Sequence, residues 1–526
     1  MRKCGSGGRL RRAERCGFVL DEKRVFEGSG VVSGLDPVAV TMTNRPNIVV
    51  WVPDDWGRDA WQLYGLGAYN SVGGTDKPVR TPNLDAFAQR GVRFTRAYSQ
   101  PWCSPSRAAF MTGRWGHKTG IGSLCEGNDA PLLDNEVCLP AALKAVSDGG
   151  YACGAFGKWH LSNMTSNPNR DGHPITVGFD EFVGTMNNIE LPESYYHFDG
   201  VYASKTPAGV TTSKKKIDRY APLWHVDEAL RWIDRQTQPW FLYMPMNLPH
   251  GPVHRPPADL YDTSYYNLPD EFPSQATSND PATCRLYFGA MVEAMDALFG
   301  RFLAGIPQET LANTYVIVWS DNGAAASTVA YPLTTPVDYS GKAKRTVYEL
   351  GCNVPLAVTG PGVTTPGRTS PALVSPCDMF STLMELTGYS ASDPLIPAVP
   401  NAGTRNSDSF KPALTAPVST VRNDLWIDLF APNRPHVNAS VVGSRALVKR
   451  VTYSSVTKDW KLVRLTSTGV TGFPSGTGNA NDQFFDLTAD PLEDTNLIAG
   501  TYTLTAEQAN AYSVLTSSYG TYTSTY

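Results

Sequence analysis

PNIVVWVPDDWG, residues 46–57, begins with an apolar run centred on residues 48–52 and leads into two aspartates, Asp54 and Asp55. A short apolar run between turn residues predicts a strand buried on both faces of a parallel sheet. Four similar runs follow, and helical patterns lie between them. The runs are 151–156, 240–246, 314–320 and 354–360, and the helical patterns are 81–91, 224–236 and 284–303. Strands that alternate with helices predict an α/β fold, with a large mixed, mostly parallel sheet flanked by helices.

The helical pattern at 81–91 carries start and stop signals. Thr81 is placed to cap the helix, Pro82 suits its first position and Gly91 lies just past its end. We therefore expect Thr81 to be the N-cap residue.

The pattern changes from about residue 400. Three shorter, alternating runs at 445–451, 459–465 and 482–487 are separated by turns rich in Ser, Thr and Gly. They predict a small C-terminal antiparallel α+β subdomain over residues 401–526, after a main domain over residues 42–400.

Residues 1–41 differ from the rest of the chain. They are basic and rich in glycine, and their apolar stretches are too short for a secretory signal. We expect either a disordered arm or upstream translation, with the native start at Met42. With no export signal in view, the expected location is the cytoplasm. No apolar window approaches the roughly 20 residues that span a membrane.

Composition excludes several classes of protein. Of 526 residues, 41% are hydrophobic and 18% are charged, and the formal net charge is -4. These values argue against a disordered tail protein and against a polybasic nucleic-acid binder. The nine cysteines are odd in number and never spaced C-x-x-C, so they favour neither a zinc knuckle nor a disulfide framework.

Polar residues follow several of the predicted strands. In open α/β sheets ligands bind beyond the carboxyl ends of the strands. Asp54 and Asp55 follow one strand, and Asp321 and Asn322 follow another. Four oxygen donors and no soft ligand suit Ca²⁺ or Mg²⁺ better than zinc. One such aspartate alone is more often a turn or cap residue, but Lys158, His160 and His250 occupy equivalent positions and strengthen the case for one site.

A second group surrounds Cys103. Pro105 suits the start of a helix, so Cys103 should lie at a helix N-terminus, with Arg107 about one turn further in. This arrangement predicts an anion-binding site with a nucleophile. Cysteine phosphatases need an arginine six positions after the cysteine, whereas here it is four positions after, so a thiolate phosphatase is disfavoured. The chain has neither the G-x-S-x-G elbow of serine α/β-hydrolases nor the P-loop of NTPases, which argues against both of these classes.

The residues from Cys103 to Arg107, followed by AAFMTGR, resemble the C-x-P-x-R signature of the sulfatase family within the alkaline phosphatase superfamily. Other stretches resemble family elements in the family's order, from about Asn44 to about Ile498. They are GKWH at 157–160, GFDEFVG at 178–184, FLYMPMNLPHGP at 241–252, VIVWSDNG at 316–323, KRTVYE at 344–349 and QFFDLTADPLEDTNL at 483–497.

The resemblance implies a formylglycine-dependent type I sulfatase that is arylsulfatase-like, with an alkaline phosphatase-like catalytic domain over 42–400. In the family a separate maturation enzyme oxidises the cysteine, here Cys103, to formylglycine. One hydroxyl of its hydrate attacks the sulfate ester, and the other later loses its proton to expel sulfate. The resemblance also implies one divalent cation, Ca²⁺ by preference and Mg²⁺ as the alternative. Its ligands would be Asp54, Asp55, Asp321, Asn322 and the residue at 103.

The family roles carry over to matching positions of this chain. Arg107 would orient the hydrated aldehyde, and Lys158 and Lys344 would bind sulfate oxygens. His250, alone or together with Lys344, would protonate the leaving alcohol. His160 would assist deprotonation of the hydrate. Lys342 is an alternative to Lys344 if the loop register differs.

The resemblance thus implies hydrolysis of a sulfate monoester, of a small molecule or a saccharide, to an alcohol or phenol plus sulfate. One alternative is a phosphonate monoester or phosphodiester hydrolase of the same superfamily. Another is an unmodified, metal-stabilised binding protein without turnover. The sequence identifies neither the sulfated alcohol nor the oligomeric state, and specificity is expected in loops such as 186–216. Neither a nucleic-acid partner nor a membrane span is expected.

Overall fold

The computed structural model describes residues 45–65, 69–70, 76–127, 129–148, 150–163, 167, 169–190, 192–268, 281–328, 340–398, 404–418, 420–433, 443–465, 482–500 and 502–525. All of them belong to one compact unit, Met42–Tyr526. The arm expected over residues 1–41 lies outside the described residues.

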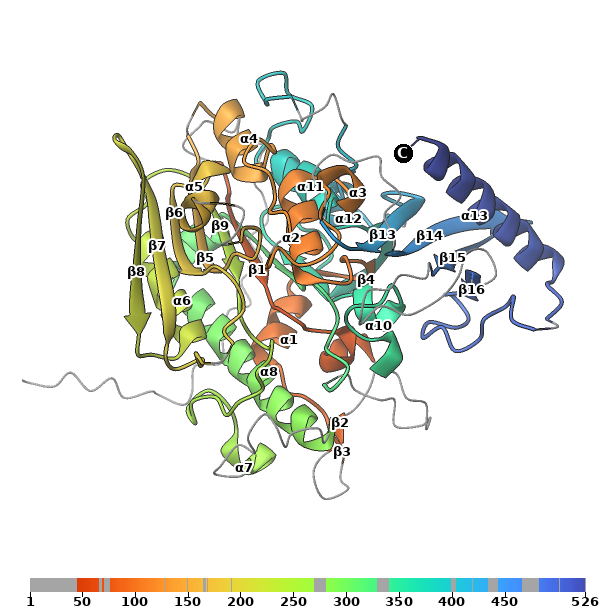
Figure 1. The fold of residues 1–526 in the computed structure, drawn as a ribbon, viewed down its shortest axis with the longest axis horizontal. Coiled ribbons are helices and arrows are strands. Elements are labelled where there is room, and N and C mark those ends of the chain that lie inside the picture. Colours follow the sequence, from red (N-terminus) through yellow and green to blue (C-terminus); the bar gives the residue numbers. More distant parts are fainter. Residues whose placement is uncertain are drawn as a thin grey trace, which may run out of the picture. The chain divides into compact units, whose positions relative to one another are not determined.

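A ten-stranded sheet forms the centre of this unit, in the order β12-β4-β11-β10-β1-β9-β5-β6-β7-β8 (Figure 1). Strand β1 pairs in parallel with β10 and β9, and β5 pairs in parallel with β9 and β6. The predicted α/β class is confirmed. The strands are β1 (Asn47–Val52), β4 (Val92–Ala97), β5 (Ala152–Lys158), β6 (Glu181–Thr185), β7 (Phe198–Thr206), β8 (Gly209–Ile217), β9 (Trp240–Pro245), β10 (Thr314–Trp319), β11 (Leu356–Thr359) and β12 (Arg368–Val374).

One predicted parallel strand is antiparallel. Strand β11, from the run at 354–360, pairs antiparallel with both β10 and β4. The chain leaves β10 at Trp319 and returns at Leu356, its register partner, so it re-enters the sheet from the same end. An apolar run reveals that a strand is buried but not which way it runs, which is why the direction was wrong.

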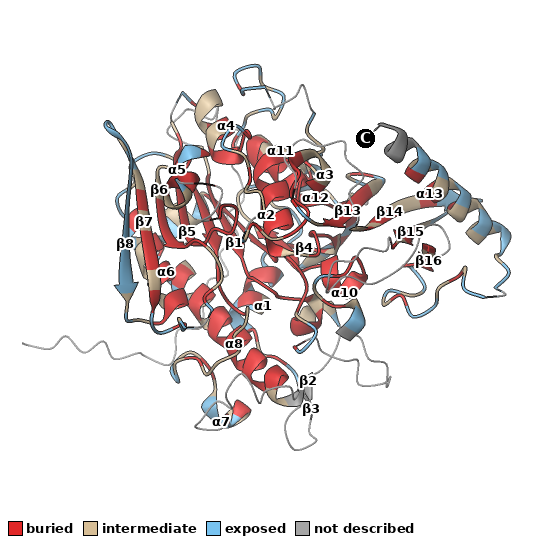
Figure 2. Ribbon diagram, in the orientation of Figure 1, coloured by how far each residue is buried: buried red, intermediate tan, exposed pale blue. Residues whose placement is uncertain are grey.

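Helices pack on both faces of this sheet. Side chains of β1 alternate between two apolar clusters: Ile48, Val50 and Val52 join one, and Val49 and Trp51 join the other. The first cluster includes residues of α2, α4 and α11, and the second includes residues of α1, α6 and α8. The longer helices are α1 (Pro82–Gln89), α2 (Cys103–Thr112), α4 (Leu139–Val146), α6 (Ala221–Ile233), α8 (Pro281–Ala304), α11 (Asp378–Leu386) and α13 (Ala506–Thr525). Figure 2 shows that α2 and β1 are buried almost throughout.

Several shorter elements connect these. They are the helices α3 (Gly116–Thr119), α5 (His173–Thr176), α7 (Thr263–Tyr266), α9 (Gln308–Ala312), α10 (Glu349–Cys352) and α12 (Lys411–Thr415), the 3-10 turns Arg58–Ala60, Gln62–Tyr64, Arg170–Gly172 and Ser340–Lys342, and the short pair β2 (Tyr69–Asn70) and β3 (Asp76–Lys77). Among the described residues no helix is both long and apolar enough to cross a membrane.

The cap of α1 differs from the prediction. The Thr81 hydroxyl does not cap the helix and instead donates to Asp85 Oδ1 at 3.1 Å. The free N–H groups of Asn83 and Leu84 donate to the Asp296 carboxylate on α8, at 3.1 and 2.7 Å. A neighbouring helix therefore supplies the cap, and a local pattern could not predict it.

A second, four-stranded antiparallel sheet follows in the order β13-β14-β15-β16, as predicted for the C-terminal region. The strands are β13 (Asp424–Phe430), β14 (Gly443–Tyr453), β15 (Val456–Arg464) and β16 (Asp482–Asp486). One apolar cluster joins this sheet to Tyr98, Val347 and Leu373 of the main domain, and another joins it to α13. The boundary near residue 400 stays a prediction.

Candidate active site

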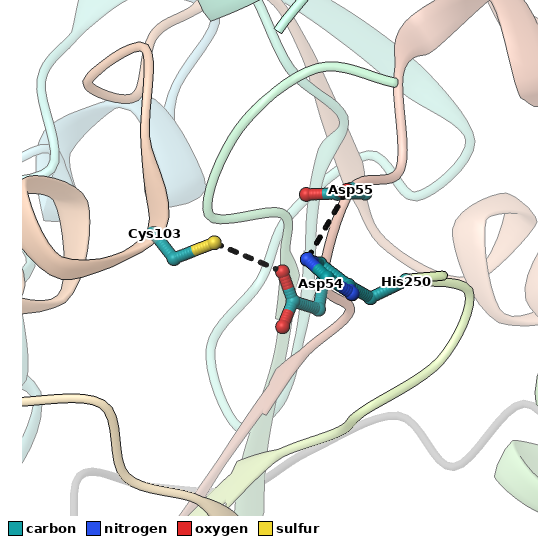
Figure 3. A group of neighbouring side chains, drawn as sticks. All are labelled: Asp54, Asp55, Cys103 and His250. Carbon is teal, nitrogen blue, oxygen red and sulfur yellow. Dashed lines mark hydrogen bonds and ion pairs between the residues drawn. The ribbon is translucent and has the colours of Figure 1, made fainter. Parts of the chain in front are cut away.

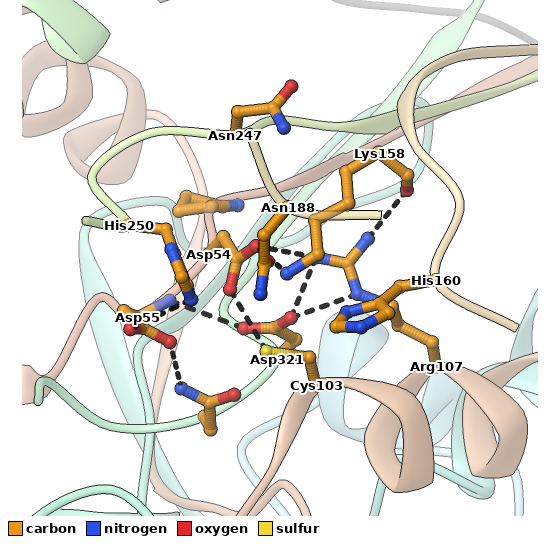
Figure 4. Close-up of polar contacts among 12 residues, drawn as sticks. Asp54, Asp55, Cys103, Arg107, Lys158, His160, Asn188, Asn247, His250 and Asp321 are labelled. Atoms are coloured by element: carbon orange, nitrogen blue, oxygen red, sulfur yellow. Dashed lines mark hydrogen bonds and ion pairs between the residues drawn. The ribbon is translucent and has the colours of Figure 1, made fainter. Parts of the chain in front are cut away.

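The structure brings together all the residues predicted for the site at the carboxyl ends of the parallel strands (Figure 4). Asp54 and Asp55 follow β1, and Asp321 and Asn322 follow β10. Lys158 ends β5, with His160 two residues later, and His250 follows β9. Because β1 lies between β9 and β10, these strand ends meet at one edge of the sheet.

Four potential ligand atoms form the centre of the site, one each from Asp54, Asp55, Cys103 and His250 (Figure 3). They all lie within 4.8 Å of one another. Cys103 Sγ is 3.3 Å from Asp54 Oδ1, and His250 Nε2 is 3.7 Å from Asp55 Oδ2. Two adjacent carboxylates that converge in a buried site fit a divalent cation.

Asn322 adds a further donor. Its Nδ2 donates to Asp55 Oδ1 at 2.7 Å, while its buried Oδ1 has no hydrogen-bond partner. A rotation of the amide by half a turn would exchange the two atoms and present the oxygen beside Asp55. An unpaired buried amide oxygen next to two carboxylates fits the oxygen-rich donor set that Ca²⁺ or Mg²⁺ prefers.

Asp321 contacts both Arg107 and the segment that bears the other two aspartates. Its Oδ2 accepts from Arg107 Nε and Nη2 at 2.9 and 2.7 Å, and its Oδ1 accepts from the Asp55 backbone N–H at 3.3 Å. Burial, with the Asp54 charge, raises the pKa of Asp321 to about 6, against the opposing effect of Arg107. In this arrangement both contacts with Arg107 go to Asp321 Oδ2, so Asp321 orients Arg107. It could also contribute a ligand to a cation.

The other carboxylates are paired with lysines. Lys158 Nζ lies 2.5 Å from Asp54 Oδ2, and Lys344 Nζ lies 2.5 Å from Asp55 Oδ1. Burial opposes ionisation of Asp54, but Lys158, His250, Arg107 and Lys344 together hold its pKa well below the ordinary value. Three cationic side chains thus face the three aspartates, as buried charges require.

Lys344, and not Lys342, reaches the site. The Lys342 ammonium donates instead to the carbonyl oxygens of Leu492 and Glu493, at 3.1 and 2.6 Å. The register that the motif predicted for this loop is therefore the one that the structure adopts.

Helix α2 begins at Cys103, two residues before the Pro105 at which the sequence placed its start. The free N–H groups and positive dipole end of α2 therefore lie at the nucleophile position, as expected for an anion site. Burial and the nearby Asp54 raise the pKa of the Cys103 thiol well above its ordinary value, although Lys158 and Lys344 oppose this effect. The unmodified thiol stays protonated at neutral pH and is a poor nucleophile.

Two residues that follow the strands have left-handed backbone, Asp55 with φ 65° and His160 with φ 59°. Such conformations cost free energy in residues other than glycine and concentrate at functional sites. The His160 ring contacts Glu126, with 2.7 Å between Nε2 and Oε1. The backbone carbonyls of Asn247 and His250 each lie 2.7 Å from the Tyr195 hydroxyl, which holds the loop that bears His250.

Three residues near the site were not predicted: Glu126, Asn188 and Asn247. Figure 4 shows Asn188 lying over the carboxylates, with Asn247 further out. The Asn188 Oδ1 is buried without a hydrogen-bond partner, and the Asn247 Nδ2 donates to Thr185 Oγ1 at 3.1 Å. Glu126 and Asn188 lie outside the family elements, and Asn247 lies within the element at 241–252 but was given no role there, so the folded arrangement reveals all three.

Comparisons with known proteins agree with this geometry. The family model described as Sulfatase matches residues 46–389, more than half of the chain. A human N-acetylgalactosamine-6-sulfatase is 30% identical over 376 residues, which cover 66% of this chain and 62% of that protein. An endo-4-O-sulfatase of Bacteroides thetaiotaomicron is 27% identical over 380 residues, covering 66% and 71%. The chain thus spans less than two thirds of the human relative's length.

Solved structures show the same fold. A Bacteroides thetaiotaomicron protein from a glycosaminoglycan-metabolism locus has a TM-score of 0.62 at 20% identity, with 90% of this chain and 94% of that one covered. A sulfatase from Pseudoalteromonas sp. has a TM-score of 0.59 at 20% identity, with 91% of each chain covered. The match to the family model includes β1 with its two aspartates, the Cys103 helix and the β10 strand end, and the chain belongs to the sulfatase family.

Proposed function

We propose that this protein hydrolyses the sulfate monoester of a saccharide to an alcohol and sulfate. The observation that carries the proposal is the buried group of Arg107, Lys158 and Lys344 around paired carboxylates, at the N-terminus of the Cys103 helix. A divalent cation would add two positive charges to this balanced set, and a sulfate ester brings one negative charge. The excess positive charge would stabilise the charge that develops as the ester bond breaks.

The relatives support a saccharide as the alcohol. N-acetylgalactosamine-6-sulfatase and endo-4-O-sulfatase are names of enzymes that act on sulfated sugars. Arylsulfatase-like activity on an activated phenol sulfate would accompany this specificity, because the reacting group is the same.

Cys103 would be converted to formylglycine by a maturation enzyme before the protein is active. The structure fits this modification, since the raised pKa of the thiol disfavours direct attack by a thiolate. When present, the aldehyde hydrate would supply the hydroxyl nucleophile, and one Ca²⁺, or Mg²⁺, would neutralise sulfate charge. Asp54, Asp55, Asn322 and Asp321 would hold the cation, together with the residue at 103.

The remaining residues would act directly on the substrate. Lys158 and Lys344 would bind sulfate oxygens, each exchanging part of its present contact with an aspartate. His250 would donate a proton to the leaving alcohol, since its Nε2 lies 3.7 Å from Asp55 Oδ2 and its side chain is partly exposed. Arg107, fixed by Asp321, would orient the nucleophile at position 103.

Mass spectrometry of the tryptic peptide from Ala97 to Arg107 tests the modification. After coexpression with a formylglycine-generating enzyme, we expect the peptide to carry an aldehyde at position 103 and the protein to release sulfate from sulfated monosaccharides. A Cys103→Ala variant is the control, which should fold and release none. An intact cysteine in a protein that still releases sulfate would contradict the proposed nucleophile, and no release from a fully modified protein would contradict the proposed activity.

A further inference from the structure

Glu126 is a carboxylate at the site that no motif predicts. Its Oε1 lies 2.7 Å from Nε2 of His160. The His160 ring is fully buried, whereas the Glu126 side chain remains 36% exposed. Figure 4 shows the His160 ring on the same side of the site as Cys103 and Arg107.

The two nitrogens of His160 have different surroundings. Nε2 contacts the Glu126 carboxylate, while Nδ1 is buried and has no hydrogen-bond partner. An ionised carboxylate only accepts hydrogen bonds, so it selects the tautomer of a neutral imidazole whose proton is on Nε2. Nδ1 then keeps its lone pair and is the only ring atom that can accept a proton.

This arrangement needs a neutral His160 ring and an ionised Glu126 carboxylate, and both are expected near pH 7. Burial and the Lys158 charge lower the pKa of His160 to about 3, with Arg107 adding and Glu126 opposing, so the ring is neutral near pH 7. Burial alone would raise the pKa of Glu126, but the His160 contact, Lys158 and His250 lower it to about 2.

The chain around this pair is tied to the nucleophile helix. The Ser104 hydroxyl, one residue after Cys103, donates to the His160 carbonyl at 2.7 Å and accepts from the Cys125 N–H at 3.0 Å. The His160 N–H donates to the Met186 carbonyl at 2.8 Å. Together with the left-handed backbone at His160, these contacts fix the ring and the carboxylate relative to Cys103.

We propose that Glu126 is a positioning residue: it accepts the Nε2 proton of His160 and so leaves Nδ1 as the ring nitrogen with a free lone pair, in a segment that is tied to the nucleophile helix through Ser104. The neutral ring can then accept a hydrogen bond at Nδ1 from a hydroxyl group in the site and so orient that hydroxyl. This inference rests on the proposed sulfatase function for its role in turnover, but the tautomer itself is independent of that function.

The experiment combines an NMR readout with kinetics. In protein labelled with ¹⁵N-histidine, the nitrogen shifts and their couplings to ring protons identify the tautomer of each histidine, and a His160→Gln variant assigns the His160 signals. We expect wild-type His160, with Cys103 unmodified or converted, to carry its proton on Nε2. Glu126→Ala should lose this single tautomer and lower kcat on an aryl sulfate by about 10- to 100-fold, with a smaller effect on KM, whereas Glu126→Gln, whose amide oxygen can still accept the Nε2 proton, should keep part of both.

Asp134→Asn is the matched control. Asp134 lies 3.4 Å from Nε2 of another buried histidine, His173, whose Nδ1 accepts from Trp159 Nε1 at 2.9 Å and contacts none of the proposed catalytic side chains, so the variant should keep the wild-type kcat and the wild-type His160 signals. Two outcomes would overturn the inference: unchanged His160 signals in both Glu126 variants, or a wild-type protein with its proton on Nδ1. If the tautomer changes as expected but wild-type protein cleaves no sulfate ester, the proposed function fails and the positioning role of Glu126 stands.

Discussion

At position 344 a lysine contacts Asp55, and at position 342 a lysine contacts the backbone of a C-terminal turn. The two side chains are two residues apart but serve different sites. A single ammonium that stabilises transferred charge in a buried site contributes far more to the rate than one that binds backbone carbonyls outside that site.

We therefore expect Lys344→Ala to lower kcat/KM on an aryl sulfate by about 10²- to 10³-fold. Lys342→Ala should lower it by less than about tenfold, since its ammonium lies outside the site. Steady-state kinetics on both variants, with melting temperatures as a check on folding, make the comparison. Equal losses would show that Lys344 has no special role.

His225 is a buried histidine that should make the stability of the protein depend on pH. Its ring is fully buried on α6, and neither nitrogen has a hydrogen-bond partner. Burial lowers the pKa of His225 to about 3, from an ordinary value of 6.5. Between these pH values the unfolded chain binds a proton that the folded chain does not, so the folded state loses stability as the pH falls.

His225→Phe should reduce this acid sensitivity. Relative to pH 7.5, wild type should lose roughly 2 kcal/mol more unfolding free energy at pH 5 than the variant does. Urea unfolding at the two pH values measures the difference. His197→Phe, at an exposed position, should behave like wild type. A His225 variant with the same pH dependence as wild type would contradict the unpaired, neutral state of this ring.

The sequence predicted which residues form the site, but it did not predict which of them contact one another. Asp54, Asp321, Lys158 and the histidines follow buried strands, and the order of the strands determines that they meet. Glu126 lies in a loop with no periodic pattern, and its role depends on a tertiary contact with His160. Such a contact leaves no local signal in the sequence.

At the scale of elements, the turn around Glu493 gives a role to the C-terminal family element at 483–497, for which the sequence predicted none. Glu493 Oε2 accepts from the Glu349 N–H at 2.6 Å, at the start of α10. The Lys461 ammonium on β15 lies 3.0 Å from Glu349 Oε1 and 2.9 Å from Glu493 Oε1. Since Lys344 lies five residues before Glu349, the second sheet fixes the loop that carries this lysine.

Replacing Glu493 by Gln should therefore affect both stability and activity. The variant leaves the buried Lys461 with one carboxylate partner, and we expect a loss of about 1–3 kcal/mol in unfolding free energy, with a lower kcat. Glu507→Gln is the control, because Glu507 pairs with Lys458 on the same sheet but is partly exposed, so it should change stability by less than about 1 kcal/mol. A Glu493 variant with wild-type stability and rate would show that the turn does not support the loop.

Strand and helix positions were predictable to different extents. β1, β5, β9 and β10 are apolar because both of their faces are buried, and the sequence located all four. β7 and β8 were not predicted, since β8 is an exposed edge strand rich in lysine and threonine. The cap of α1 and the direction of β11 depend on partners distant in the chain, which local patterns do not encode.

At the scale of the whole molecule, the site joins segments from residue 54 to residue 344, and the second sheet supports it from beyond residue 424. A cation bound at Asp54 and Asp55 would thus link several parts of the fold. A ligand that binds only the folded state raises its stability, by about 2.7 kcal/mol at a hundredfold excess over Kd.

Removal of metal should therefore lower the melting temperature of the protein. We expect the melting temperature of EDTA-treated protein to rise on addition of Ca²⁺, and that of an Asp55→Asn variant to stay the same. Differential scanning calorimetry with Ca²⁺ and Mg²⁺ titrations measures both. A variant that responds like wild type would place the cation elsewhere.

The choice between a sulfate ester and a phosphonate monoester belongs to the same scale, because both carry one negative charge and the arrangement of the whole site has to distinguish them. The measurement is the ratio of kcat/KM for an aryl sulfate to kcat/KM for the phosphonate monoester of the same phenol, on formylglycine-containing protein. We predict a ratio well above one, together with sulfate release from a sulfated monosaccharide. A ratio below one would identify the protein as a phosphonate monoester hydrolase and contradict the proposed function.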